Sequence, residues 1–247
     1  MRYFLELAYF GKAYHGWQNQ PNAISVQEEI ERALSVVFQQ KMAIVGAGRT
    51  DAGVHAKQIF AHFETNNELE KEAFQFKMNS LLPADIALRD FFKVKPGAHA
   101  RFDALSRSYE YHIVQHKDPF LEDRSFFLKN KLDVGKMNEA AEILKDYTNF
   151  KCFSKSKTDV KTYNCKITEA VWKNENGVLV FHISADRFLR NMVRAIVGTL
   201  LEIGLGKQPI ENMHEVIRSK DRSKAGTSVP AKGLYLTRVT YPEIAIK

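Results

Sequence analysis

Two hydrophobic periodicities alternate along the first part of the chain. In "RYFLELAYF" (2–10) apolar residues occupy every second position, as in a strand with one buried face. In "SVQEEIERALSVVF" (25–38) they recur three and four residues apart, which predicts a helix, and Ser25 followed by Glu28 has the spacing of a capping box. The same patterns recur as strands at 53–65 and 85–96 and as a helix at 68–82 that ends before Pro83.

A comparable series follows in the rest of the chain. Residues 108–116 alternate as a strand, and 167–184 predict a hairpin turned at Asn176-Gly177, a pair that suits two-residue turns. The most apolar helical pattern, 186–206, ends near Gly204. Further helices are predicted at 133–147, with Asp133 as N-cap, and at 209–219, beginning at Pro209.

The order of these elements predicts an α+β fold made of two similar halves. Each half would be an antiparallel sheet backed by helices. The predicted boundaries are 1–103 for the N-terminal domain and 104–247 for the C-terminal domain. Between the last predicted helix and the C-terminal segment, residues 219–233 combine basic and small side chains, and their composition predicts a loop that is flexible without a partner.

Composition narrows the class of protein. Of 247 residues, 45% are hydrophobic and 26% charged, which is ordinary for a globular protein, and no apolar run approaches the roughly 20 residues of a membrane span. Cys152 and Cys165 suit neither a disulfide framework nor a zinc site, and no cleavable signal pattern opens the chain, so we expect a reduced, cytoplasmic setting. The net charge of +7 is compatible with a polyanionic partner but does not require one.

The glycine-rich stretch "GAGRTDAGVHA" (46–56) carries a single carboxylate, Asp51. A phosphate-binding Walker loop would need lysine after Gly53, and a dinucleotide fingerprint would need glycine in place of Asp51. His55 and His62 would point to opposite faces of their strand, which disfavours a metal site, and no second acid of a glycosidase pair is nearby. Taken alone, Asp51 is more typical of an Asx-turn than of a catalytic group.

Arginine gives the second unusual feature. Arg49 lies two residues before Asp51, and Arg187, Arg190 and Arg194 are spaced i, i+3 and i+7, which places them on one face of the predicted helix. A solvated face is the simpler interpretation of that cluster. The apolar residues around Arg194 nevertheless place it at the edge of the core, where a buried arginine requires a carboxylate.

"GRTDAGVHA" resembles a motif of the tRNA pseudouridine synthase A family. The resemblance continues in the same order through most of the chain, from Gly46 to Leu236. It implies an isomerase that converts uridines at positions 38, 39 and 40 of the tRNA anticodon stem-loop to pseudouridine. It also implies that no cofactor or metal is used, and that a homodimer binds one tRNA across both subunits. The other similar segments are "MNSLLPADI", "HARFDALSRSYEY", "RFLRNMVRAIVGTLLEIGLG" and "AGTSVPAKGLYL".

The resemblance also assigns roles to residues. Asp51 would be the nucleophile, and Arg194 would pair with it across a cleft between the two halves to keep it ionised and aimed. Tyr109 would stack on a uracil that has been flipped out of the stem, with Arg49 contacting a phosphate or filling the gap left by the base. From the residues alone, Tyr109 and Tyr111 are equally good core tyrosines on one strand face.

Two other function classes remain open at this stage. A catalytically silent tRNA-binding protein would keep its affinity without the carboxylate, and a small-molecule glycosidase or nucleoside enzyme would act on free uridine. Basic residues elsewhere could hold an RNA backbone through salt-sensitive contacts, although each alone is more typical of solvated surface. These residues are Lys155, Lys157, Lys161, Arg222 and Lys224.

Overall fold

The computed structural model describes residues 1–155 and 160–243, a mixed α/β chain with mostly antiparallel strands. The chain separates into two compact units. The first comprises Met1–Ser106 together with the described residues from Tyr235 onward, and the second comprises Arg107–Leu234. Within the described part, no helix is long and apolar enough to cross a membrane.

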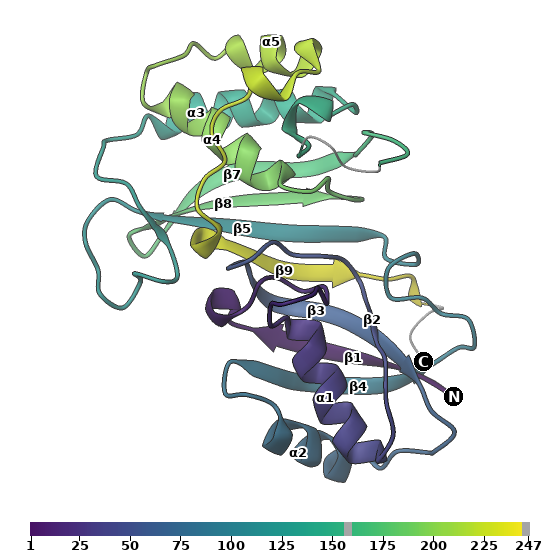
Figure 1. The fold of residues 1–247 in the computed structure, drawn as a ribbon. Coiled ribbons are helices and arrows are strands. Elements are labelled where there is room, and N and C mark those ends of the chain that lie inside the picture. The colour runs from purple at the N-terminus through teal and green to yellow at the C-terminus, as the bar shows by residue number, and fades with distance from the viewer. Residues whose placement is uncertain (156–159, 244–247) are drawn as a thin grey trace. The chain divides into compact units, whose positions relative to one another are not determined.

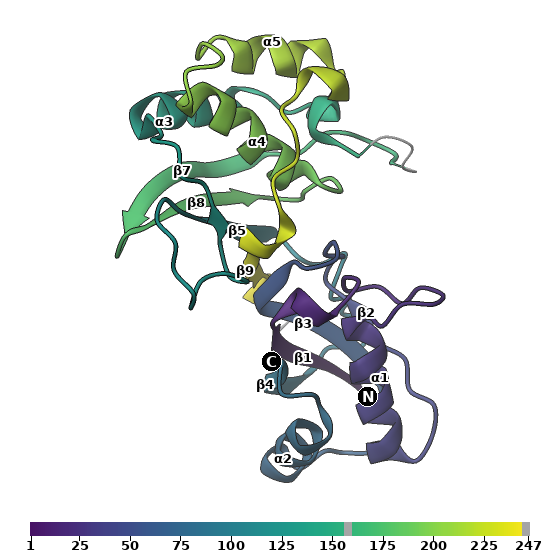
Figure 2. The same cartoon turned by 60° about the vertical axis from the view of Figure 1, so that its left-hand side comes forward.

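In the first unit the strands follow the order β4-β1-β3-β9, and the short β2 pairs with β3 (Figure 1). β1 is antiparallel to both β3 and β4, whereas β9 runs parallel to β3. Helices α1 and α2 lie together on one face of β1, β3 and β4 (Figure 2). The elements are β1 (Arg2–Tyr9), α1 (Val26–Phe38), β2 (Val45–Gly46), β3 (His55–Glu64), α2 (Lys71–Leu81), β4 (Ile86–Val94) and β9 (Leu234–Thr240).

The helix signals of the first unit act as predicted at α1. The Ser25 hydroxyl accepts a hydrogen bond from the Glu28 backbone N–H at 3.1 Å, which confirms the N-cap. The helix ends at Phe38, because the C-cap Gln39 has a φ of 54° and turns the backbone into the left-handed region. α2 begins later than predicted because the Glu70 carboxylate caps it and accepts from the backbone N–H groups of the first turn.

In the second unit the order is β5-β8-β7, with β6 parallel to β5. The β7–β8 hairpin turns at Asn176 and Gly177, both with positive φ, and this confirms the predicted turn. α3 and α4 cover one face of this sheet, and α5 lies beyond them (Figure 2). The elements are β5 (Ser106–Val114), β6 (Phe126–Phe127), α3 (Val134–Glu142), β7 (Ile167–Glu175), β8 (Val178–Ala185), α4 (Met192–Gly204) and α5 (Asn212–Ser219); short 3₁₀ turns span Gly11–Ala13, Ile143–Asp146, Lys151–Phe153, Arg222–Lys224 and Ala231–Gly233.

The C-terminal strand differs from the sequence prediction, which placed everything after residue 103 in the second half. Instead β9 pairs with β3 of the first unit, with Tyr235 opposite His55 and Leu236 opposite Ala56. The Val239 backbone N–H adds a bond to the side-chain oxygen of Gln58 at 3.0 Å. The first unit is therefore assembled from both ends of the described chain.

Candidate active site

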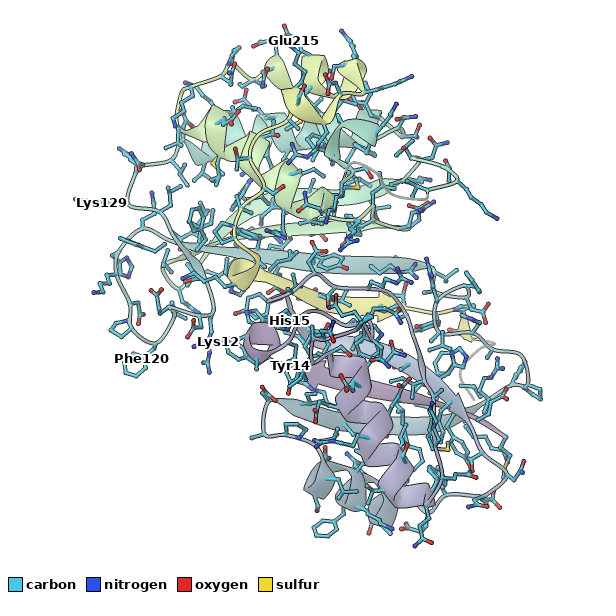
Figure 3. The ribbon with its side chains drawn as sticks, in the orientation of Figure 1. Lys12, Tyr14, His15, Phe120, Lys129 and Glu215 are labelled. Carbon is cyan, nitrogen blue, oxygen red and sulfur yellow. The ribbon has the colours of Figure 1, made fainter. Side chains whose placement is uncertain are left out.

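Asp51 lies on the loop between β2 and β3, and the backbone on both sides of it is tied to one neighbouring segment. Before it, the Thr50 carbonyl accepts from the Trp17 backbone N–H at 3.3 Å. After it, the Gly53 N–H donates to the Tyr14 carbonyl at 3.3 Å. Tyr14 belongs to the stretch between the first 3₁₀ turn and α1, where Figure 3 labels it. The half-exposed carboxylate therefore projects from a fixed stretch of backbone.

Two glycines allow this segment to approach the loop so closely. A Cβ at Gly16, where φ is +95°, would lie 2.4 Å from the Thr50 carbonyl oxygen. A Cβ at Gly11 would lie 2.0 Å from the Val54 carbonyl oxygen. The turn after Asp51 is closed by a backbone bond, from the Val54 N–H to the Asp51 carbonyl at 3.2 Å. This bond closes the turn through backbone groups.

Arg49 lies on the same loop, exposed to solvent. Its Nε donates to the side-chain oxygen of Gln18 at 3.1 Å, from the segment that also holds Thr50. This bond restrains a long side chain that would otherwise sample many rotamers. Arg49 and Asp51 are therefore presented from one braced loop of the first unit.

In the second unit, Arg194 is half-buried on α4 and is fixed by the segment that precedes β9. Its Nε donates to the Val229 carbonyl at 2.7 Å, and the Val229 N–H donates to the Arg194 carbonyl at 3.2 Å. The Nε bond sets the plane of the guanidinium group, which a lysine could not reproduce. The prediction that Arg194 borders the core is confirmed.

The segment that fixes Arg194 was predicted to be a flexible loop, and the structure corrects this. The buried Gly226 N–H donates to the Thr199 hydroxyl of α4 at 2.9 Å. The Arg222 guanidinium donates to the Ala225 and Gly226 carbonyls, both at 3.2 Å, and to the Ser228 hydroxyl at 2.8 Å. Composition suggested a solvated loop, but its polar side chains and backbone groups bond to each other and to the helix.

The predicted helical row of three arginines is wrong. α4 begins only at Met192, because Asn191 has a φ of 68° and interrupts the helical backbone. Arg187 and Arg190 therefore lie in the irregular segment before the helix, and only Arg194 is on it. Because the apolar pattern continues through Phe188 and Leu189, the sequence predicts a longer helix than the one in the structure.

The structure separates the two tyrosines that the sequence left equivalent. Tyr111 is fully buried, its hydroxyl donates to the Pro230 carbonyl at 2.9 Å, and burial raises the pKa of that hydroxyl. Tyr109 is half-buried on the same strand, and its ring meets the edge of Phe188 at a centroid distance of 5.1 Å. Tyr111 is thus a packing residue, and Tyr109 is the one with an accessible side chain. The spacing of Phe188 in the sequence does not predict this contact.

Several side chains that could suggest other chemistry have structural roles. His55 and His62 each accept a backbone N–H through Nδ1, from Gly11 at 2.9 Å and from Ala100 at 3.1 Å. Across residues 1–155 and 160–243, no group of three His, Cys, Asp or Glu side chains could hold a metal ion. Burial raises the pKa of both free cysteine thiols to about 12, well above that of a reactive thiolate.

The basic residues expected at an RNA backbone have mixed surroundings. Lys155 uses its backbone N–H to hold the Arg190 carbonyl at 3.0 Å, and both Lys161 and Lys224 are exposed. Arg222 is engaged within its own segment, as described above. Lys157 lies outside the described residues. Contact of the exposed lysines with an RNA backbone stays a prediction.

These features define a mixed α/β protein with one rigidly mounted carboxylate in its first unit, and an anchored arginine and an accessible tyrosine in its second. A family model described as tRNA pseudouridine synthase matches residues 7–103 and 140–242. The chain belongs to this family.

Similar proteins cover nearly the whole chain. One from Parabacteroides distasonis is 53% identical, over 98% of this chain and 96% of its own length. One from Porphyromonas gingivalis is 52% identical, over 98% and 97%, and one from Acetivibrio thermocellus is 39% identical, over 96% and 98%. All three are named tRNA pseudouridine synthase A.

Proposed function

We propose that this protein is a tRNA pseudouridine synthase, an isomerase acting on uridines 38, 39 and 40 of the anticodon stem-loop, with Asp51 as its nucleophile. The observation that carries the proposal is the mounting of Asp51. A carboxylate held by backbone bonds on both sides, within a chain of this family, has the fixed aim that a nucleophile needs.

The reaction explains why one carboxylate suffices. The bond from ribose C1′ to uracil N1 breaks, the base turns, a bond from C1′ to C5 forms, and the proton on C5 is replaced by one on N1. No water or redox carrier is consumed. Asp51 would act by attacking C1′, by attacking C6 of the base, or by stabilising an oxocarbenium-like ribose.

Arg194 and Tyr109 complete the proposed catalytic set, so residues of both units would act on the same nucleotide. Arg194 would pair with the Asp51 carboxylate, because an opposite charge favours the ionised form and a planar guanidinium fixes its orientation. Its bond to Val229 supports this role, since it limits the directions in which the terminal nitrogens point. The Tyr109 ring would stack on the flipped uracil, and its hydroxyl would assist removal of the C5 proton.

The substrate and setting follow the same proposal. The tRNA would be held mainly through its phosphates, and Arg49, exposed on the loop that carries Asp51, would contact one of them or fill the space of the flipped base. A homodimer and a cytoplasmic location complete the proposal. Sedimentation of the protein with and without tRNA tests the dimer.

The decisive experiment replaces Asp51 with Asn, which keeps the shape and removes the charge. With saturating enzyme and a stem-loop RNA, Asp51→Asn should abolish pseudouridine formation and leave the dissociation constant nearly unchanged, because phosphates dominate binding. Asp90→Asn is the control, since that carboxylate is part of a surface ion pair with Lys71. Substantial turnover by Asp51→Asn would remove the nucleophile assignment, and turnover of free uridine by the wild type would favour a nucleoside enzyme.

A further inference from the structure

A small pocket lies beside the catalytic loop, entirely within the first unit. Its volume is about 140 Å³. The walls include Trp17 and Gln18 from the segment before α1, Gly46 from β2, Gly48 from the loop that carries Asp51, and two cations, Arg49 and Arg101. No carboxylate is among the residues that line it.

The two glycines of this pocket differ in a way that points to a ligand. A Cβ at Gly46 would lie 2.4 Å from the indole nitrogen of Trp17, so packing inside the protein accounts for that glycine. A Cβ at Gly48 would have no atom within 4 Å, and its φ lies outside the left-handed range. The fold therefore accepts a side chain at Gly48. The small residue leaves space in the pocket that Arg49 and Arg101 also line.

Both arginines are restrained at the pocket. Arg49 is held through its Nε by Gln18, as described above. The Arg101 guanidinium lies 5.8 Å from the centroid of the exposed Phe102 ring, and the Arg101 backbone N–H is bonded to His99 at 3.1 Å. Two restrained guanidinium groups at one concave site favour an anion with several oxygens, because each offers N–H donors in a planar fork.

The size of the pocket selects among anions. Pockets for a drug-sized ligand measure roughly 300–1,000 Å³, and a water occupies about 30 Å³. A cavity of about 140 Å³ is therefore too small for a whole nucleotide and large enough for a phosphate group with bound water. We infer that this pocket binds one backbone phosphate of the RNA, with Arg101 and Arg49 as its cationic contacts. The inference rests on the proposed function and adds Arg101 as a substrate-binding residue.

The test measures affinity for a stem-loop RNA in Arg101→Gln. Its dissociation constant should rise about tenfold at low salt, and the slope of log affinity against log salt should fall by about one, as for the loss of one phosphate contact. Since Arg101 is exposed, the variant should fold normally.

A matched pair at Gly48 tests the pocket itself. Gly48→Glu and Gly48→Gln fill the same space, but only Glu adds a negative charge, so Glu should weaken binding further than Gln does. A scan that replaces one phosphate at a time by a neutral methylphosphonate should then find a position that weakens wild-type binding and has no effect in Arg101→Gln.

The possible outcomes are distinct. The phosphate site would be overturned if Arg101→Gln had the affinity and the salt dependence of the wild type. It would also be overturned if the variant lost affinity at the same methylphosphonate positions as the wild type. Pseudouridine formation by the wild type is a separate measurement, which tests the proposed activity. If the wild type forms no pseudouridine, the proposed activity fails, whereas the binding measurements still decide the pocket.

Discussion

His62 should make the protein lose stability in mildly acidic solution. The side chain is 5% exposed on β3, its Nδ1 accepts the Ala100 N–H, and its ring stacks on Phe4. Burial, followed by the nearby charges of Arg2 and His99, lowers the pKa of His62 from 6.5 to about 4. The charges of Glu64 and Asp103 act more weakly in the opposite direction.

Whether acid stabilises or destabilises the protein depends on which state, folded or unfolded, binds the proton on His62 more readily. Below about pH 6.5 the unfolded chain protonates this histidine, while the folded protein keeps it neutral until about pH 4. The contribution is therefore complete above the higher value and is lost as the pH falls to the lower one. Each pKa unit corresponds to about 1.4 kcal/mol, so lowering the pKa of His62 from 6.5 to about 4 makes the full loss roughly 3 kcal/mol.

Urea unfolding across this pH range measures the effect. His62→Gln keeps a side-chain acceptor for the Ala100 N–H but does not titrate, so its free energy of unfolding should fall less steeply with acid. Part of the slope should remain, because burial also lowers the pKa of His99. His15→Gln, at an exposed site labelled in Figure 3, is the control and should follow the wild type. Parallel curves for His62→Gln and the wild type would refute the reasoning.

Three further predictions concern the proposed site. Arg194→Lys should lower turnover roughly a hundredfold in a single-turnover assay, because a small error in the position of the catalytic group has an effect of that size. Urea unfolding should show only a modest loss of stability. A near-normal rate would show that Arg194 does not orient Asp51. Tyr111→Phe should cost about 1 kcal/mol of stability and spare turnover, whereas Tyr109→Phe should keep stability and RNA binding and slow C5 proton removal in rapid-quench kinetics; identical behaviour would contradict the distinction. Gly16→Ala should lower the free energy of unfolding by at least about 1 kcal/mol and lower turnover, because its Cβ collides with the Thr50 carbonyl oxygen. Wild-type activity in this variant would show that the close contact between Gly16 and the Asp51 loop is not needed.

The sequence was informative wherever the signal is local. The Ser25 cap, the Asn176-Gly177 turn and the strand at β1 each depend on neighbouring residues, and the structure has all three, although Phe4 is also buried on the second face of β1. The composition of the loop that carries Asp51, and its resemblance to a family motif, are also visible in the sequence. The hydrogen bonds that tie this loop to Tyr14 and Trp17 are not predictable from the sequence, because a bond between backbone groups does not depend on residue type.

The errors have the same physical origin. The start of α4 depends on one left-handed residue, Asn191, inside an apolar pattern that continues through it. The anchor of Arg194 is a carbonyl of Val229, and any residue there would supply one. β9 joins a strand that lies far earlier in the chain, and no periodicity records that partner.

The return of β9 to β3 bears on how the protein is made. His55 and Ala56, which pair with β9, come directly after the catalytic loop, whereas Tyr235 and Leu236 are near the end of the chain. A ribosome that has synthesised Asp51 must still add the whole second unit before the neighbouring strand exists. The sheet behind the loop is thus completed only after the second unit has been synthesised, so a chain that stops before β9 retains Asp51 but lacks a strand that supports its loop. The proposed activity would then report on chains that extend through β9, and chains that stop before β9 carry an unpaired strand edge that favours aggregation.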